Sequence, residues 1–404
     1  MTKEERKIIA ITTAAHGLNH GFILIFAAVL PILQEIFQTG YFHLGMIGNI
    51  CFLAHGLGSL PAGILTDVLG AKRLIWLYLF GAAFSSFLVA VSNSLMMFGV
   101  FIGLMGLFCS TYHPASSTLI SRGLQKQGKG FGIHGISGSL GIALTPIVAS
   151  FFASALGWKF AYAIFGIAGV AVGMASLTLR DVAQQSPDND AEGGSPTREE
   201  AKLFLLPLII FFTTTAMLGL CYRGVLTFLP AYMAKNVQID FLSIGSVALG
   251  GMMATIALLF GTIGQYVGGT LSDRYLPEGV YFYAHLLGIP FLFLIGFSTD
   301  FYVVLFAIAY AFFNFATQPL GSHLLARYTS ERFRGTGYGI HFLLNFGVGS
   351  FASSLCGYLA DRLGLEWVFY SMGSLFFISG VLSLTLIILT RRTLPDPTTR
   401  TARA

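Results

Sequence analysis

Twelve long apolar segments constrain the fold of this chain more than any other feature of its sequence. A helix needs about 20 mainly apolar residues to cross the hydrocarbon core of a bilayer. The segments that meet this requirement are residues 8–36, 44–66, 74–93, 95–121, 131–155, 158–179, 203–233, 243–270, 280–298, 301–326, 336–360 and 366–390. Only 10% of the 404 residues are charged, whereas soluble domains carry about 25%. We therefore predict an all-α membrane protein with twelve transmembrane helices.

Basic residues are distributed unequally between the two sets of predicted loops. Of the 23 lysines and arginines, Arg223 lies inside a segment, Lys159, Lys235 and Arg362 lie on one side, and all others lie on the side of the chain ends. Cytoplasmic loops carry such an excess, so we expect a multi-pass protein of a bacterial inner membrane with both termini in the cytoplasm. The net charge of +5 is then a signal of topology, and no nucleic-acid partner is predicted.

Neither the N-terminus nor the cysteines indicate processing or a metal site. The first apolar run lacks a small-residue cleavage site, so we expect it to be retained as the first helix. The four cysteines all lie inside predicted helices without paired spacing, which is typical of small packing residues. The sequence therefore predicts no disulfide, no metal site and no cofactor.

An internal repeat divides the chain into two similar halves. The matching segments are 63–67 with 269–273, 114–122 with 319–327, 130–134 with 337–341 and 158–160 with 367–369. A polar stretch rich in Asp, Ser, Gly and Pro separates the halves and is typical of a flexible linker. We predict a six-helix bundle over 1–180, a cytoplasmic linker over 181–202 and a second six-helix bundle over 203–404. Two such bundles can expose a site between them alternately to either side of a membrane.

These repeated segments resemble the major facilitator superfamily. The signature loop of that family between helices two and three is matched here by Gly63, Asp67, Gly70, Lys72 and Arg73, with Val68 where the family usually has a base. The loop after the eighth helix keeps Gly269, Asp273 and Arg274, and a third copy after the eleventh has Gly357, Asp361 and Gly364.

The resemblance implies the twelve-helix fold of that family and transport of a small-molecule substrate. It also implies gating residues at the cytoplasmic ends of the helices, namely Asp67, Lys72, Arg73, Arg122, Asp273 and Arg274. Asp67 and the Lys72/Arg73 pair would latch the two halves together on that side. A second interpretation stays open, in which Lys72 and Arg73 only anchor the loop on the cytoplasmic side.

Within that superfamily, two segments are similar to fosmidomycin-resistance-type exporters. The first is His16, Leu18, Asn19 and His20, and the second is His113, Pro114, Ser116 and Ser117. His20 stands where the first pattern has an acid, so no carboxylate of the first helix is available there for proton coupling. This resemblance implies efflux, and thus favours export by an antiporter.

Polar residues inside the apolar segments are the candidates for substrate binding. The resemblance places helices 1, 4, 7 and 10 around a central cavity, and the polar residues of these helices are His16, Asn19, His20, His113, Tyr222, Arg223, Asn314 and Gln318. Arg223 is the only charged residue well inside a segment, which favours an anionic organic or drug-like solute. Imidazoles titrate near pH 6.5 when unperturbed, so protons are a candidate coupling ion for His16, His20 or His113.

Structural roles remain open for each of these side chains. Arg223 could bond helix carbonyls or extend outward, and the histidines and amides could form interhelical hydrogen bonds. We expect packing or gating from His134 and His341. His55, His285 and His323 are expected to be structural.

Other functions are less consistent with the sequence. Transition-metal transport through His16 and His20, spaced by one helical turn, is the alternative, although Arg223 in the same cavity argues against it. No GxxxxGK[ST] loop for ATP and no HExxH motif occurs, so neither an ATP-driven pump nor an enzyme is predicted. We expect a monomer whose partners are a small solute and the lipid bilayer.

Overall fold

The computed structural model describes residues 1–125, 127–180, 198–238, 244–329, 337 and 340–393. Within these ranges, twelve helices are long and apolar enough to cross a membrane, which confirms the predicted all-α membrane fold. The elements are α1 (Lys3–Phe37), α2 (Tyr41–Leu69), α3 (Ala71–Ala90), α4 (Leu95–Ser110), α5 (Tyr112–Gly123), α6 (Gln127–Leu156), α7 (Trp158–Ser176), α8 (Arg198–Asn236), α9 (Ser246–Arg274), α10 (Pro277–Phe297), α11 (Asp300–Tyr328), the π-helix η3 (Leu343–Val348), α13 (Ala352–Leu363) and α14 (Glu366–Thr393).

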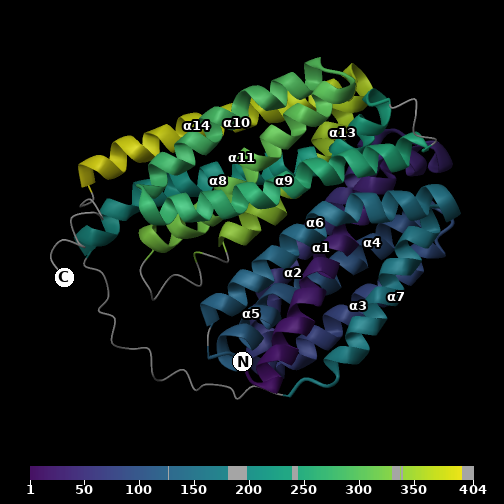
Figure 1. Ribbon diagram of the computed structural model, residues 1–404, viewed down its shortest axis with the longest axis horizontal. Coiled ribbons are helices and arrows are strands. Elements are labelled where there is room, and N and C mark those ends of the chain that lie inside the picture. Colours follow the sequence, from purple (N-terminus) through teal and green to yellow (C-terminus); the bar gives the residue numbers. More distant parts are fainter. Residues whose placement is uncertain (126, 181–197, 239–243, 330–336, 338–339, 394–404) are drawn as a thin grey trace.

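The helices form two bundles, one from α1 to α7 and the other from α8 to α14 (Figure 1). The bundles meet at one end of the molecule and diverge at the other. Helix α1 begins and α14 ends at the diverging end, as an even number of crossings requires. Helix α8 begins at Arg198, inside the predicted linker 181–202, and residues 181–197 lie outside the described part of the chain.

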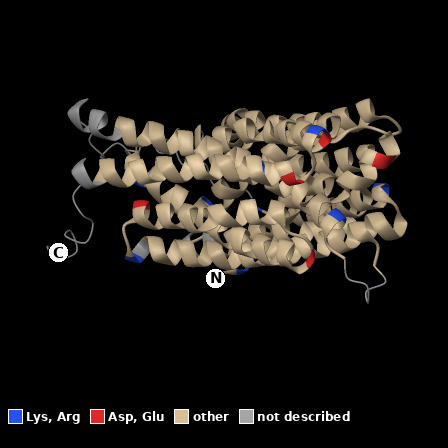
Figure 2. Cartoon of the chain, turned by 90° about the horizontal axis from the view of Figure 1, so that it is seen from above, with Lys and Arg blue, Asp and Glu red and all other residues tan. Residues whose placement is uncertain are grey.

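The outer surface of the bundles is apolar. Met96, Tyr266 and Phe297 expose 81%, 76% and 76% of their surface, and few positions along the described helices in Figure 2 are Lys, Arg, Asp or Glu. A soluble protein rarely exposes a continuous apolar surface of this kind. Hydrocarbon chains of lipid are therefore the solvent that this surface requires.

Two predicted helices are interrupted. The segment 95–121 is divided at Thr111 into α4 and α5, next to the carbonyl of Ser110, which Pro114 cannot bond because it lacks an N–H. The segment 336–360 contains the π-helix η3. Single π-helical turns often occur at functional sites, and η3 supplies side chains to the central cavity.

Close backbone approaches join the bundles at the end opposite the termini. A Cβ atom at Gly45 of α2 would lie 2.2 Å from the carbonyl oxygen of Ser353 in α13. Between α6 and α9, a Cβ atom at Gly251 would lie 2.5 Å from the carbonyl oxygen of Pro146. Glycine at these positions is thus what allows this end to close.

Candidate functional site

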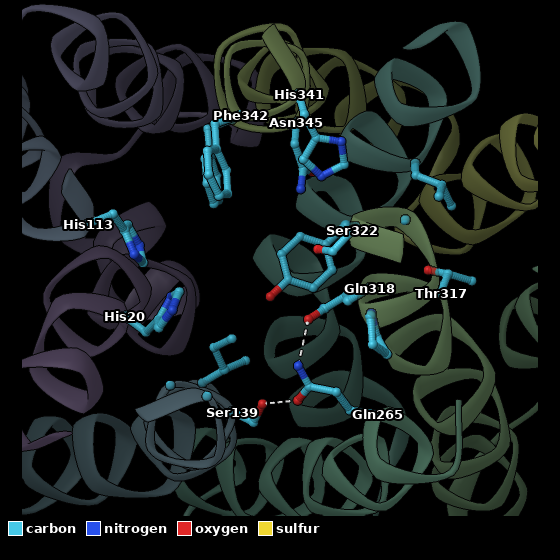
Figure 3. A pocket seen from close by; sticks show the side chains of 18 of the residues that line it. His20, His113, Ser139, Gln265, Thr317, Gln318, Ser322, His341, Phe342 and Asn345 are labelled. Atoms are coloured by element: carbon cyan, nitrogen blue, oxygen red, sulfur yellow. Dashed lines mark hydrogen bonds between the residues drawn. The ribbon is translucent and has the colours of Figure 1, made fainter. Parts of the chain in front are cut away.

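A cavity of about 430 Å³ lies between the two bundles. Helices α1, α2, α5 and α6 line it from the first bundle, and α8 to α11 with residues 341–346 line it from the second. His20 and Asn314 lie near the middle of α1 and α11, so the cavity is at about half the length of the helices. Figure 3 shows His20 and His113 facing Gln318 and Ser322 across it.

Seven of the eight predicted binding residues line this cavity. They are His16, His20, His113, Tyr222, Arg223, Asn314 and Gln318. Asn19 is instead fully buried, with its amide nitrogen 3.5 Å from His113 Nε2. Asn19 is one residue before His20, and successive residues differ by about 100° around a helix, so its side chain packs beside His113 without lining the cavity. The binding roles of all eight residues stay predictions.

Imidazole rings form the wall on the first bundle. The Nδ1 atom of His16 lies 2.7 Å from the backbone carbonyl of His134, so Nδ1 carries a proton and donates. The lone pair of His16 Nε2 can then accept a hydrogen bond from His20 Nε2, which is 3.2 Å away. The ring of His16 also stacks on that of His134, with centroids 4.1 Å apart. This network fixes the orientation of His16.

Arg223 of α8 is the buried charge of the site. Its side chain is only 4% exposed, and its guanidinium carbon lies 3.5 Å from the ring centroid of Phe52 in α2. Its Nε atom has no hydrogen-bond partner, and among the described residues no carboxylate lies within ion-pair distance of it. The aromatic ring stabilises the cation only in part, so an anion in the cavity would supply the missing partner.

Amides and hydroxyls form the wall opposite the histidines (Figure 3). Gln265 of α9 donates through Nε2 to Gln318 Oε1 of α11 at 3.4 Å. Ser139 of α6 donates a short hydrogen bond to Gln265 Oε1, and this bond joins the two bundles. These groups can both donate and accept, which suits the hydroxyl or amide groups of a polar solute.

Several cavity residues were not predicted, and some left a signal in the sequence. Gln265 is an isolated amide in the apolar segment 243–270, so it could have been found by its polarity alone. His134 and His341 occupy equivalent positions of the repeat, and both line the cavity, although packing or gating was expected of them. Ser139 and Asn345 gave no such signal, because small polar residues are common between membrane helices.

The three histidines expected to be structural differ in their surroundings. His55, expected to be structural, is buried and lines the cavity. His285 is buried between α10 and α14, with Nδ1 2.7 Å from the Tyr281 carbonyl and Nε2 2.9 Å from Ser379 Oγ, which is a structural arrangement. His323 is exposed.

The predicted gating residues lie at the diverging end. Arg73 and Arg274 are exposed, whereas Lys72 lies over the ring of Trp76 at 4.8 Å. Arg122 is half-buried in the last turn of α5. The side chains of Asp67 and Asp273 lie outside the described residues. Gating by all six stays a prediction.

Comparison with known proteins points to one family. A sequence profile described as Major Facilitator Superfamily matches residues 9–250 and again 241–404. A protein of Escherichia coli (strain K12) named as an L-galactonate transporter is 23% identical over 64% of this chain and 62% of its own length. A protein of Staphylococcus haemolyticus (strain JCSC1435) named as a proline/betaine transporter is 24% identical over 65% of this chain and 58% of its own. The chain thus matches less than two thirds of the length of these two relatives.

The fold agrees with solved transporter structures. The crystal structure of a bacterial homolog of the human lysosomal transporter Spinster, in an inward-facing and unoccupied conformation, superposes with a TM-score of 0.78. The sequences are 14% identical, and the match covers 98% of this chain and 100% of that one. At this identity the likeness shows the fold alone.

Proposed function

Because the chain belongs to the major facilitator superfamily, we propose that it is a secondary active transporter of a small anionic organic or drug-like solute. The solute binds in the cavity between the bundles, which open alternately to the two sides of the membrane. The observation that carries this proposal is the buried guanidinium of Arg223, which has no described acid beside it.

The energetics of a buried cation support an anionic solute. A charged side chain at the centre of a membrane costs at least about 2.5–3.5 kcal/mol. Two opposite charges about 4 Å apart attract each other by about 4 kcal/mol at an effective dielectric constant of 20. A carboxylate beside Arg223 would therefore offset the cost of its burial, and the planar guanidinium binds both carboxylate oxygens.

The two relatives described above are named for solutes that share one group. L-Galactonate, proline and betaine all carry a carboxylate, although proline and betaine also carry a positive charge. We therefore narrow the proposed class of solute from organic anions to carboxylates. Ser139, Gln265 and Gln318 would bind the polar remainder of the solute.

The proposed direction of transport rests on the resemblance of residues 16–20 and 113–117 to fosmidomycin-resistance-type exporters. We propose export from the cytoplasm of a bacterium by a monomer with both termini inside. The present conformation would then be open toward the cytoplasm, where the bundles diverge. His16, His20 and His113 are the candidates to carry a coupled proton, because the described cavity wall contains no carboxylate.

Counterflow in proteoliposomes tests the proposal. A panel of carboxylates, zwitterions, amines and neutral solutes of similar size is assayed with and without a pH gradient, for wild type and Arg223→Gln. Removing one partner of a buried charge pair costs about 2–5 kcal/mol. We therefore expect Arg223→Gln to lower the counterflow of carboxylates, and of carboxylates only, by at least about 30-fold. Lys235→Gln removes an exposed charge and should have no effect. Unchanged carboxylate counterflow in Arg223→Gln, or a preference for amines, would refute the proposal.

A further inference from the structure

Three histidines on the first bundle converge on one point beside the cavity. One ring nitrogen from each of His16, His20 and His113 lies within 4.8 Å of the other two. The Nε2 atoms of His16 and His20 are 3.2 Å apart. The three ring centroids are 5.0, 5.3 and 5.8 Å from one another. Among the described residues, no other group of three His, Cys, Asp or Glu side chains has such spacing.

The spacing of His16 and His20 matches that of two ligands in a tetrahedral metal site, and His113 lies close enough to be a third. Zinc–imidazole bonds of about 2.0–2.1 Å place ligand nitrogens about 3.3 Å apart and ring centroids about 5 Å apart. The pair of His16 and His20 already has the nitrogen spacing. His113 is half-buried and borders the cavity, so a change in its side-chain torsions can bring its nitrogen nearer. We propose that His16, His20 and His113 bind one divalent transition-metal ion of the zinc class.

The surroundings of His16 are those of a metal ligand. A ligating imidazole usually donates its second N–H to a carbonyl or carboxylate, which fixes the ring and its tautomer. His16 makes this hydrogen bond to the His134 carbonyl at 2.7 Å. A Cβ atom at Gly138 would lie 2.3 Å from His16 Cε1, so the absence of a side chain at Gly138 provides the space for the ring.

A second buried group points to the site. The side chain of Asn19 is 0% exposed, and its Oδ1 atom has no hydrogen-bond partner. Its amide nitrogen lies 3.5 Å from His113 Nε2. Rotation of this amide by half a turn would let Oδ1 accept a ring proton of His113 and hold that imidazole in place.

The ligand set determines the chemistry of the ion. Three neutral imidazoles suit Zn²⁺, Co²⁺ or Ni²⁺ and leave a fourth coordination position. His20 and His113 point into the cavity (Figure 3), so this position is open to a ligand there. Arg223 lines the same cavity, so an anion as that ligand would offset the repulsion between the guanidinium and the metal ion.

The location of the ligands indicates a resident ion rather than a transported one. His16 and His20 lie on α1 and His113 lies on α5, so all three belong to the first bundle. A site within one bundle stays assembled when the two bundles move against each other. This differs from the cavity as a whole, which needs both bundles.

Metal binding to the purified full-length chain tests the inference without any transport assay. The protein, freed of its affinity tag and treated with chelator in detergent, is titrated with Co²⁺ and followed by its visible absorption. Equilibrium dialysis then measures Zn²⁺ per chain. We expect one ion per chain with a tetrahedral cobalt spectrum that Zn²⁺ abolishes. Absence of saturable binding to the wild-type protein would overturn the inference.

Matched variants locate the site. His16→Ala, His20→Ala and His113→Ala should each weaken binding at least tenfold, and Gly138→Ala should weaken it about 10–100-fold while all three ligands remain. His323→Ala removes an exposed histidine and should leave binding unchanged. Gel filtration and thermal melting confirm that each variant is folded. Wild-type affinity in a variant lacking all three ligands would overturn the inference. Arg223→Gln should retain the metal, so this proposal and the anion proposal fail separately.

Discussion

Removing the carboxylate of Asp361 should weaken the closed end of the molecule. Helix α2 begins after Gly40, which has no side chain to cap it. Asp361 of α13 takes this role from the other bundle, because its two oxygens accept hydrogen bonds from the backbone N–H groups of Tyr41 and Phe42, both at 2.8 Å. This contact exists only while the two bundles meet at this end. Its loss should therefore shift the equilibrium toward conformations that are open there.

The magnitude follows from the energetics of helix capping. An N-cap side chain contributes about 0.5–2 kcal/mol, and a negative charge at a helix N-terminus contributes about 0.3–1 kcal/mol. Asp361 is exposed, which reduces both contributions. We therefore expect Asp361→Ala to destabilise the closed conformation at this end by about 1–2 kcal/mol. This corresponds to an increase of roughly 5–30-fold in the ratio of open to closed conformers at this end. Asp361→Asn keeps one acceptor and should have a smaller effect.

Distances between spin labels at this end provide the assay. Lys159 of α7 and Lys235 of α8 lie near it on different bundles, and the four native cysteines are buried, so cysteines introduced at these two positions can be labelled. The matched control is Asp300→Asn, since Asp300 accepts a hydrogen bond from the backbone of Gln238 within the second bundle. The Asp300→Asn control and the wild type should give the same distance distribution. If Asp361→Ala also gives the wild-type distance distribution, the contact does not stabilise the closed end.

Two further predictions concern the second bundle. Gly264→Ala would place a Cβ atom 1.9 Å from the carbonyl oxygen of Phe312. It should therefore lower the free energy of unfolding by about 1–3 kcal/mol, measured by thermal melting. The control is Gly63→Ala, whose added Cβ atom would meet no atom within 4 Å. An equal melting temperature for both would be inconsistent with the tight packing of α9 on α11. Glu278→Gln removes the charge of a fully buried carboxylate 3.4 Å from Arg327 Nε. We expect the free energy of unfolding to fall by about 1–3 kcal/mol, which is less than for a fully buried pair because Arg327 is 18% exposed. Wild-type stability in the same melting assay would contradict this prediction.

The fold could be predicted from the sequence because the bilayer leaves few alternatives. Long apolar segments must be helical in lipid, since each backbone polar group needs a partner within the segment. The repeat then predicted two bundles. The division at Thr111 could not be placed from Pro114, because Pro146 and Pro319 lie inside continuous helices. The π-helix Leu343–Val348 could not be placed either, because it depends on local hydrogen bonds that hydropathy does not report.

The candidate site could be predicted in part, for a related reason. Polar residues are costly in a membrane, so His20 and Arg223 stood out against apolar neighbours. The sequence did not indicate that His113 lies beside His16 and His20, because that proximity results from the packing of α5 on α1. The end at which the bundles diverge could not be predicted either, because one sequence must encode each conformation of the proposed transport cycle.

A reversible cross-link between the bundles tests most directly the claim that this chain transports by alternating access. The side chains of Asn49 in α2 and Ser354 in α13 form a hydrogen bond at the closed end, so cysteines at both positions should form a disulfide. We expect oxidation to abolish solute counterflow, reduction to restore it, and either single cysteine to have no effect. Counterflow at the wild-type rate in fully cross-linked protein would contradict the account.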